Sequence, residues 1–530
     1  MKRLTLILIM LMASSVRAAT IYVDNSVADC IGTYSVANRN ATGSETSYDT
    51  PQEAQDIANP DDFIYFRAGR YTNPSENDDA DVLKILRSGT EGHPITYTNY
   101  NNEVVILDAS RDGDNGHNYT VTMGTKPSTV DNSGSGVTDI TIDGLIIEGA
   151  WAVGMRICGE ADFSGTAVVP SRRISIKNCI ARYQIGINGW GQGIATVGTV
   201  FNVVIEDCEF YENTGTGVEF GRLSKDLHWA EPDDDRSTAN DSIIRNCLSY
   251  NNDDPCRPGN TDGIGSSHSY NCTIEDCISF GNSDDGMDVY GALQNTIQNN
   301  LVFYNLAYPD AGSGTGIKIS AGGGGRHTVR SNISYGNKGM GIEGSDSSYQ
   351  EYPSLIYNNI TCDVNNTGIA LCYEISYDAN SPGYEKSFLR NNIFVDSNNN
   401  DVYHIFAAIS DCDYNFIGME ANYNEQQGYG MDANSLTGTT GLHEQDVVID
   451  VNFVGMTFAE KLAHIRSQFA TAFALNEGSL LIDAGEIVEG YHNATAGPGE
   501  LEVWYGLAPD IGVYESNYDV TDTYLMAKEE

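Results

Sequence analysis

Three carboxylates stand within five residues of one another in the segment NSDDGMDVYG, residues 282–291. The segment is rich in turn formers and short of helix formers, so it predicts a tight turn that runs into a strand. Side chains of a strand alternate between its two faces, so Asp288 points outward while Met287 and Val289 point into a core. Clustered carboxylates repel one another unless a cation neutralises them, and hard oxygen ligands suit calcium. The segment therefore indicates a calcium site, although a solvated acidic turn explains the same residues equally well.

A short strand followed by a small polar pair recurs through the middle of the chain. The second residues of these pairs are Cys179, Cys208, Cys247, Cys277, Asn300, Asn332, Asn359 and Asn392. Consecutive members are separated by 23 to 39 residues. A helical repeat would not vary so much, whereas the coils of a β-solenoid accept loops of different length. Each coil then covers its neighbours' core, and equivalent positions form columns about 4.8 Å apart along the axis.

A second set of strands can also be laid over one another. They share a pattern of glycine, apolar residue and variable residue, and they start at Gly217, Gly263, Gly286, Gly316 and Gly341. The variable residue points outward, so Asp288 and Lys318 fall in one column on adjacent coils. Asp262 likewise falls one coil before Asp285. The sequence thus predicts that four acids, counting Asp284, and one lysine converge on one patch.

The eleven cysteines are better explained by packing than by disulfides. Four of them occupy the column of polar pairs, where a line of disulfides is implausible, and a free cysteine packs as a small apolar residue. Asparagines in the same column are expected to bond the backbone of neighbouring coils. Two disulfides stay open, Cys362 with Cys372 and Cys256 with Cys272.

The first hundred residues hold an export signal pattern and a capping-helix pattern. Residues 1–18 have a charged start, an apolar stretch too short to span a bilayer and a cleavage site near Ala18, as in a secretory signal peptide. A strand pattern at 20–24 is followed by a short helix that starts at Thr50 and Pro51, and then by further strand patterns. This order resembles the start of many secreted right-handed parallel β-helix proteins.

The composition argues against some partners. The 530 residues carry a formal net charge of -44 and the pI is about 4.3, which disfavours binding to nucleic acid or to an anionic membrane. No apolar run after the first is long enough to cross a bilayer. The 55 glycines and 14 prolines suit many short strands and turns. We expect a monomer that is exported, extracellular or periplasmic, and not inserted in a membrane.

Three motifs on successive coils resemble the active-site coils of polysaccharide lyase family 9, whose members include pectate lyases. They are DG at 262–263, NSDDGMDVY at 282–290 and GTGIK at 314–318. The family has asparagine between the glycines of the third motif, where this chain has Thr315, and more often phenylalanine after the glycine of the first motif, where it has Ile264. The resemblance covers about residues 140–400.

The resemblance implies a fold and a set of roles. The fold is all-β, a right-handed parallel β-helix with a short N-terminal capping helix and a C-terminal capping tail. The implied calcium ligands are Asp262, Asp284, Asp285 and Asp288, and the implied catalytic base is Lys318.

The chemistry of β-elimination agrees with those roles. A lyase on a 4-linked uronan removes the proton at C5, which is only weakly acidic beside a negative carboxylate. Calcium held by aspartates and bound to that carboxylate would neutralise it and stabilise the developing charge. A lysine, with an ordinary pKa of about 10.4, acts as a base only where calcium and partial burial depress its pKa. The alternative is a plain surface salt bridge between Asp288 and Lys318, and the full set of spacings argues against it.

A polyanionic substrate requires cations, and the chain has few near the motifs. The candidates for substrate contact are Arg257, His268, Tyr290, Arg326, His327 and Lys338. Taken alone, each charged candidate is better explained as a solvated surface residue, and Tyr290 could either stack on a sugar ring or pack. A long insertion at 223–241 is expected to wall the cleft, with Trp229 as a candidate for stacking on a sugar ring.

The ladder of polar pairs fades after about residue 415, and residues 458–465 predict a helix. Segments 478–485 and 507–515 resemble the closing parts of many secreted β-helices, so we expect this tail to cover the last coil and its exposed edge. The predicted organisation is a signal peptide (1–18), an N-terminal cap with the first coils (19–139), a parallel β-helix catalytic core (140–414) and a C-terminal capping segment (415–530).

We therefore expect a secreted, calcium-dependent lyase that cleaves a uronate-containing polysaccharide, with pectate or polygalacturonate as the first substrate. Another uronan, such as alginate, rhamnogalacturonan or ulvan, would suit the same chemistry. A β-helix glycoside hydrolase would use Asp284 and Asp285 as acid and base and would need neither calcium nor Lys318. A non-catalytic calcium-binding surface protein would keep the aspartates and tolerate loss of Lys318.

Overall fold

The structure is a computed structural model that describes most of the chain from residue 18 to residue 485. The described residues are 18–75, 77, 80–111, 117–125, 135–159, 170–186, 190–222, 239–256, 259–306, 313–319, 325–344, 354–362, 364, 367–370, 387–395, 400–403, 410–413, 415–417, 423–424, 436–437, 448–474, 479, 481 and 485. The predicted signal peptide up to residue 17, the substrate candidate Arg257, the stacking candidate Trp229 and the closing segment 507–515 lie outside them.

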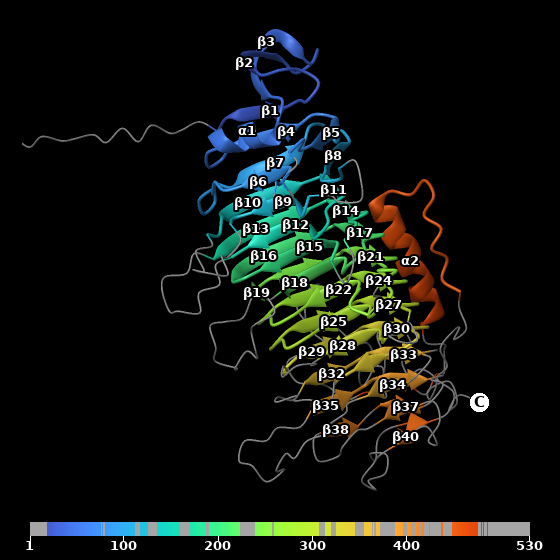
Figure 1. The fold of residues 1–530 in the computed structure, drawn as a ribbon. Coiled ribbons are helices and arrows are strands. Elements are labelled where there is room, and N and C mark those ends of the chain that lie inside the picture. Colours follow the sequence, from blue (N-terminus) through green and yellow to red (C-terminus); the bar gives the residue numbers. More distant parts are fainter. Residues whose placement is uncertain are drawn as a thin grey trace, which may run out of the picture.

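The described strands form three long sheets, here called A, B and C, which wrap round a common axis (Figure 1). Sheet A has 16 strands: β2 (Cys30–Ser35), β3 (Asn40–Tyr48), β1 (Thr20–Val23), β4 (Phe63–Phe66), β7 (Ile95–Asn99), β10 (Thr138–Asp143), β13 (Ser171–Lys177), β16 (Val200–Glu206), β20 (Ile243–Arg245), β23 (Thr273–Glu275), β26 (Thr296–Gln298), β29 (Thr328–Arg330), β32 (Leu355–Tyr357), β35 (Ser387–Arg390) and β38 (Ser410–Asp413), with β19 (Ala239–Asn240) paired to β16.

Sheet B has 13 strands: β5 (Gly69–Thr72), β8 (Val105–Asp108), β11 (Ile146–Glu148), β14 (Ile180–Arg182), β17 (Glu209–Tyr211), β21 (Leu248–Tyr250), β24 (Ile278–Phe280), β27 (Leu301–Phe303), β30 (Ile333–Tyr335), β33 (Ile360–Cys362), β36 (Ile393–Val395), β39 (Phe416–Ile417) and β41 (Leu436–Thr437). Sheet C has 12: β6 (Leu83–Ile85), β9 (Tyr119–Met123), β12 (Val153–Cys158), β15 (Gln192–Val197), β18 (Val218–Arg222), β22 (Ile264–Ser266), β25 (Met287–Val289), β28 (Ile317–Ile319), β31 (Ile342–Glu343), β34 (Thr367–Ala370), β37 (Asn400–Tyr403) and β40 (Tyr423–Asn424).

Each coil contributes one strand to each sheet, in the order A, B, C, and pairs in parallel with the coils before and after it. The exception among the described strands is β2, which runs antiparallel to β3 at the N-terminal edge of sheet A. The predicted all-β parallel β-helix is therefore confirmed.

The inward faces of the sheets carry apolar side chains in columns. One column of sheet A consists of Ile142, Ile176, Ile205, Ile244, Ile274, Ile297, Val329, Ile356 and Leu389, all at most 1% exposed. Successive side chains of a strand point to opposite faces, so a shift of one residue in any pairing would bring polar side chains into this column. Burial of the column therefore sets the register that also aligns the outer faces.

Each polar pair of the repeat stands at the bend from sheet A to sheet B, and its two residues have different tasks. The first residue has a positive φ, for example 51° at Asn178 and 55° at Asp207, a conformation that Asn and Asp tolerate better than most residues. The second residue is buried between coils. The Asn332 amide group is fully buried, donates to Asn359 Oδ1 at 2.9 Å, and accepts from the Asn300 backbone amide at 3.0 Å.

The ladder and the cysteine column follow the prediction, with one addition. Asn392 donates to Asn415 Oδ1 at 2.9 Å, so the ladder reaches one coil further than expected. The four cysteines of the column are buried and free. The predicted alternative of a Cys256–Cys272 disulfide is wrong, because Cys256 is exposed, Cys272 is buried and both are free. Cys372, the proposed partner of Cys362, lies outside the described residues.

A second ladder stands at the bend from sheet B to sheet C, and the sequence analysis missed it. Its members are Gln184, Asn213, Asn252, Asn282, Asn305 and Asn337, each bonded to the next. Asn282, the first residue of the acidic segment, therefore has a structural role as a member of this ladder. It holds the turn that carries Asp284 and Asp285 onto the stack.

Two helices lie outside the coils. Helix α1 (Pro51–Ile57) begins as predicted, with the Thr50 side chain accepting from the Glu53 amide and proline in the first turn. It packs against β1, β3 and β6 at the N-terminal end of the stack (Figure 1). Among the described residues, neither helix is long and apolar enough to cross a membrane.

Helix α2 (Phe458–Ala472) confirms the helix predicted at 458–465, but not its place. Its buried face packs on the outer face of sheet B, where Tyr250, Phe280 and Phe303 stack on one another. Lys461 pairs with Glu209, and Arg466 donates to the Asp276 carbonyl at 2.6 Å. Figure 1 shows α2 along the flank of the solenoid. The expectation that this segment covers the last coil is therefore wrong for α2, because the outer aromatic side chains of sheet B need cover from water.

Replacing Asn332 by alanine should lower the free energy of unfolding by about 2–4 kcal/mol, because the substitution leaves the buried Asn300 amides without an acceptor. Urea unfolding followed by circular dichroism measures the change. Asn38→Ala, at an exposed turn position, is the matched control and should change stability by less than about 0.5 kcal/mol. Equal stability of the two variants would contradict the ladder's contribution.

Candidate active site

The outer face of sheet C brings together the residues that the alignment of strands predicted. Gly265 of β22 pairs with Asp288 of β25, Asp288 pairs with Lys318 of β28, and Lys318 pairs with Glu343 of β31. The predicted column with Asp288 and Lys318 on adjacent coils is thus confirmed. Lys318 has an acidic neighbour on each side of it, because the register adds Glu343 on the following coil.

The turns before these strands hold two more carboxylates. Asp262 precedes β22 and Asp285 precedes β25 by two residues each, and the Asp285 amide donates to Asp262 Oδ1 at 3.2 Å. The turn at Asp285 closes tightly because residue 286 is glycine. A Cβ atom there would lie 2.1 Å from Val302 Cγ1 and 2.8 Å from the Gly316 carbonyl oxygen. The glycine of the motif therefore lets the acids approach the next coil.

Three carboxylates form the acidic trio, Asp262, Asp285 and Asp288. Each offers an oxygen that lies within 4.8 Å of the oxygens of the other two. Asp262 is 8% exposed and Asp285 is fully buried. Asp288 Oδ1 is buried without a hydrogen-bond partner, which is costly for a carboxylate oxygen unless a cation is present. The trio is therefore a built group of hard oxygen donors of the kind that divalent cations bind.

Burial and mutual repulsion raise the pKa values of these acids. Burial, followed by the charges of Asp284, Asp288 and Asp285, holds the pKa of Asp262 well above its usual range. Burial likewise raises the pKa of Asp288 to about 7, against an opposing effect of Lys318. Ionising all of these acids at the same time therefore costs free energy in this arrangement.

Lys318 projects its ammonium group into the same patch. Its Nζ lies 3.3 Å from Asp285 Oδ2 and 4.0 Å from Asp288 Oδ2, and its side chain is 20% exposed. Burial acts to lower the pKa of Lys318, but the negative charges, chiefly of Asp288 and Asp285, outweigh it and hold the pKa above its usual value. In the absence of a cation, Lys318 is therefore fully protonated.

Asp284, the fourth predicted ligand, lies outside the trio and bridges three coils. Its Oδ1 accepts from the Ser313 amide at 2.6 Å, on the following coil, and its Oδ2 accepts from the Asn260 amide at 2.7 Å, on the preceding coil. Burial, then the charge of Asp285, raises its pKa to about 6. The structure therefore gives Asp284 a positioning task, and its role as a ligand stays a prediction.

Three polar residues of this site escaped the sequence analysis as functional residues. Ser313 donates through Oγ to Asp285. The Thr315 amide donates to Asp285 Oδ1 at 2.9 Å, and the Thr315 hydroxyl donates to Glu343 Oε2 at 2.9 Å. Thr315 occupies the position at which the third motif departs from the family pattern. That departure was the sequence feature that could have drawn attention to Thr315. Its hydroxyl holds Glu343 beside Lys318.

The remaining substrate candidates divide between surface and interior. His268 and Tyr290 lie together, since the His268 amide donates to the Tyr290 carbonyl at 2.7 Å and their rings meet edge to face at 5.5 Å. Lys338 is exposed in the turn next to the site, where the Gly339 amide donates to the Gly314 carbonyl. Arg326 is exposed at a different bend, between sheets C and A.

The prediction that His327 contacts the substrate is wrong. The residue is fully buried, and its Nδ1 accepts from the Asn295 amide at 3.2 Å. Burial lowers its pKa to about 4, so it stays neutral and cannot attract a polyanion. His327 lies in the interior because the chain turns inward there, just before strand β29. The exposed neighbour Arg326 gives no sign of this in the sequence.

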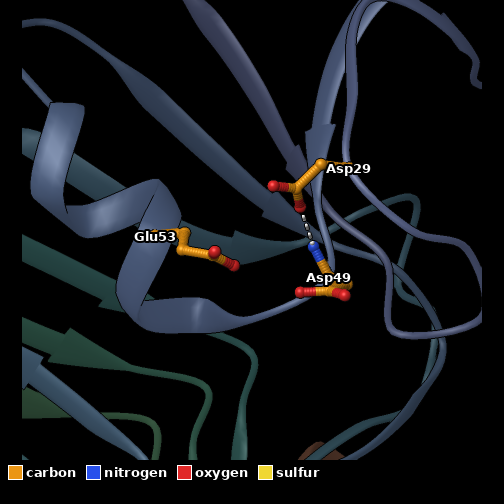
Figure 2. A group of neighbouring side chains, drawn as sticks. All are labelled: Asp29, Asp49 and Glu53. Carbon is orange, nitrogen blue, oxygen red and sulfur yellow. Dashed lines mark hydrogen bonds between the residues drawn. The ribbon is translucent and has the colours of Figure 1, made fainter.

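A second acidic group lies at the N-terminal end and consists of Asp29, Asp49 and Glu53 (Figure 2). All three are exposed. The Asp49 amide donates to Asp29 Oδ1 at 3.1 Å, and Glu53 takes part in the cap of α1. Turn and cap contacts thus account for the group, and we assign no metal to it.

The comparisons with known proteins find similarity in the part of the chain that carries these motifs. A family model described as "Pel9A-like, right handed beta helix region" matches residues 159–380. "Pectate lyase L" of Thermoclostridium stercorarium is 31% identical over 179 residues, 31% of this chain and 14% of that protein. "Pectate lyase L" of Dickeya dadantii (strain 3937) is 22% identical over 375 residues, 68% of this chain and 70% of that protein. The chain thus spans only a small part of the first relative and about two thirds of the second.

A solved structure extends the likeness to the whole fold. "Crystal structure of pectate lyase Pel9A" has a TM-score of 0.52 at 18% identity and covers 95% of this chain and 98% of its own. At that identity the likeness shows the fold alone. The matched residues 159–380 include all of the trio and Lys318, so the predicted resemblance to polysaccharide lyase family 9 is confirmed for that part of the chain.

Proposed function

We propose that this protein is a calcium-dependent polysaccharide lyase that cleaves a uronate polymer by β-elimination, with polygalacturonate as the first substrate. The observation that carries the proposal is the pairing of Asp288 with Lys318 on adjacent strands, beside Asp262 and Asp285. The names of the pectate lyase relatives support it. We propose further that residues 1–18 are removed on export, as action on an extracellular polymer requires.

The acidic trio fits a calcium ion. Three carboxylates converge, and the buried Asp288 Oδ1 lacks a partner. Asp262, Asp285 and Asp288 would hold the ion, with Asp284 beside them. When bound, calcium supplies positive charge that neutralises a uronate carboxylate and so acidifies the neighbouring C5 proton.

Lys318 then has the position and the environment of a general base. The negative charges round it keep it protonated. Once those carboxylates are neutralised, the attraction is lost and burial favours the neutral amine. Lys318 Nζ takes the proton from C5, the electron pair forms the C4–C5 double bond, and the bond from C4 to the glycosidic oxygen breaks. The leaving oxygen takes a proton from solvent.

The structure disfavours the alternatives from sequence. A surface salt bridge does not explain Asp288 and Lys318, because their charged atoms lie 4.0 Å apart and each side chain is only 20% exposed. A hydrolase would need Asp285 as a free acid or base, but this carboxylate accepts from Thr315, Ser313 and Lys318. A non-catalytic calcium protein gives no reason for a lysine among its ligands, since a cation there weakens calcium binding.

Lys318→Ala should reduce activity by about 10²–10⁴-fold, the usual contribution of a general base. Lys318→Arg should be equally inactive, because arginine keeps the charge and does not give up its proton. The assay records near-ultraviolet absorbance of the unsaturated product on polygalacturonate, alginate, rhamnogalacturonan and ulvan, with calcium or with chelator.

The matched control is Lys177→Ala, which removes a lysine beside Asp143 on sheet A and should keep full activity. Full activity of Lys318→Arg would remove the base from the mechanism. New reducing ends without absorbance would indicate a hydrolase instead.

Calcium affinity should fall as the pH falls from 8 to 5.5. A carboxylate with a raised pKa takes up a proton within this range, and the ion must displace that proton; Asp288, with a pKa of about 7, and Asp262 are the groups concerned. Isothermal titration calorimetry at several pH values measures the affinity. Asp288→Asn should weaken binding at pH 8 by about tenfold or more. Glu53→Gln, in the exposed group of Figure 2, should behave like the wild type, and a pH-independent affinity would exclude the trio as the calcium site.

A further inference from the structure

Arg156 stands on the same outward column of sheet C as Lys318. The column runs through Arg156, Ala195, Glu219, Gly265, Asp288 and Lys318. These are five steps between adjacent coils, or about 24 Å at the usual strand spacing. A chain molecule that lies along this column therefore passes both residues.

The guanidinium group of Arg156 is buried with almost no polar partner. The residue is 6% exposed, and its Cζ lies 3.4 Å from the centroid of the Tyr119 ring. Its one hydrogen bond to a described residue is a long contact of 3.4 Å from Nη2 to the Thr122 hydroxyl. Nε is fully buried without a partner, and no carboxylate of the described chain lies within 4.0 Å.

Several other arginines of the solenoid pair with a carboxylate. Arg67 pairs with Glu103 at 2.8 Å, and Arg182 pairs with Glu148 at 2.7 Å. Even the half-exposed Arg173 pairs with Asp139 at 2.7 Å. Arginine keeps its charge under all ordinary conditions, and the face of a tyrosine compensates a buried charge less well than a carboxylate does. Because no carboxylate of the described residues pairs with Arg156, its environment points to a ligand.

The surroundings indicate which anion this is. Partly buried Tyr119 and Trp151 pack on the apolar cluster that contains Ala195, the neighbour of Arg156 in the column. An aromatic ring beside a cation, as at Tyr119 and Arg156, suits a sugar that carries a carboxylate, because aromatic rings pack on apolar C–H faces and arginine binds a carboxylate with two parallel hydrogen bonds. Glu219, further along the column, accepts hydrogen bonds from Ser267 and Gln192.

We propose that Arg156 and Tyr119 form a distal subsite that binds the carboxylate of a uronate several sugars away from the bond that is cleaved. The inference rests on the proposed function, because it takes a uronan as the ligand of sheet C. It adds that the enzyme prefers long chains, since short oligomers that fill the site at Lys318 do not reach Arg156.

The test measures binding rather than cleavage. In the Lys318→Ala background, with calcium, calorimetry compares trimers and long oligomers of polygalacturonate, alginate, rhamnogalacturonan and ulvan. Adding Arg156→Met should weaken binding of long oligomers by about tenfold or more, the value of a charge-assisted hydrogen bond, and leave trimer binding unchanged. Arg156→Lys should be intermediate, because it keeps the charge and loses the paired geometry. Arg173→Met, which removes a paired arginine of sheet A, is the control and should leave both unchanged.

A thermal melt separates this subsite from a structural role. If Arg156 serves a ligand, Arg156→Met removes an unpaired buried charge and the melting temperature stays the same or rises. A lower melting temperature, equal loss of trimer and long-chain binding, or no loss at all would each overturn the subsite. Absence of binding by any uronan in the Lys318→Ala parent would overturn it too. Loss of long-chain binding on Arg156→Met in a protein whose wild type gives no ultraviolet product would instead support the subsite and reject the lyase.

Discussion

A single coil of this solenoid cannot cover its own core, and that constraint determines where every functional group lies. Each strand must pair with the strand of the next coil in the one register that keeps the apolar column inward, as at Ile142, Ile176 and Ile205. The same register also aligns the outward-facing residues of adjacent coils with one another. Asp288 and Lys318 are 30 residues apart in sequence, yet they are direct neighbours because Met287 and Ile317 must both point inward.

The site is an electrostatic exception within that regular stack. Other charges on the outer faces form ion pairs, such as Arg245 with Glu206 on sheet A. In the acidic trio, burial and repulsion raise the pKa values of Asp262 and Asp288 instead. The stack tolerates this cost because the asparagine ladder and the tight turn at Gly286 hold the backbone whether or not the acids are neutralised. A rigid backbone with unfavourable charges is a suitable place to bind a cation, since the ion relieves a repulsion that folding has already paid for.

Whether the position of a residue could be predicted from the sequence depends on whether that residue belongs to the repeat. The columns at Asp288 and Lys318 were predictable because period and alternation fix the face of every repeat residue. The interior position of His327 was not, since it stands between strands and its face depends on the path of the bend. The hydrogen bonds of Asp284 to Asn260 and Ser313 were equally out of reach, because both partners lie in turns whose lengths differ from coil to coil.

The position of helix α2 on sheet B is likewise a feature that the sequence did not predict. The sequence pattern at residues 458–465 predicted a helix, and the structure adds a capping box formed by Thr457 and Glu460. Its docking place depends on the outer aromatic residues of sheet B, such as Phe280 and Phe303, which lie 155 or more residues earlier in the chain. Local pattern specifies the element, and only the assembled stack specifies the surface on which it lies.

Sheet C shows why two cations in one column are of different types. Lysine is a compact ammonium whose pKa responds to burial and to neighbouring charges, so it can lose its proton when the acids round it are neutralised. Arginine stays charged, and its planar fork suits a carboxylate. Lys318 stands among carboxylates that can be neutralised, and Arg156 stands against a tyrosine face with no carboxylate of the described chain beside it. The first environment suits a group that must change its protonation state, and the second suits a group that must only attract. The residue types therefore match the proposed division of one face into a catalytic end at Lys318 and a substrate-binding end at Arg156.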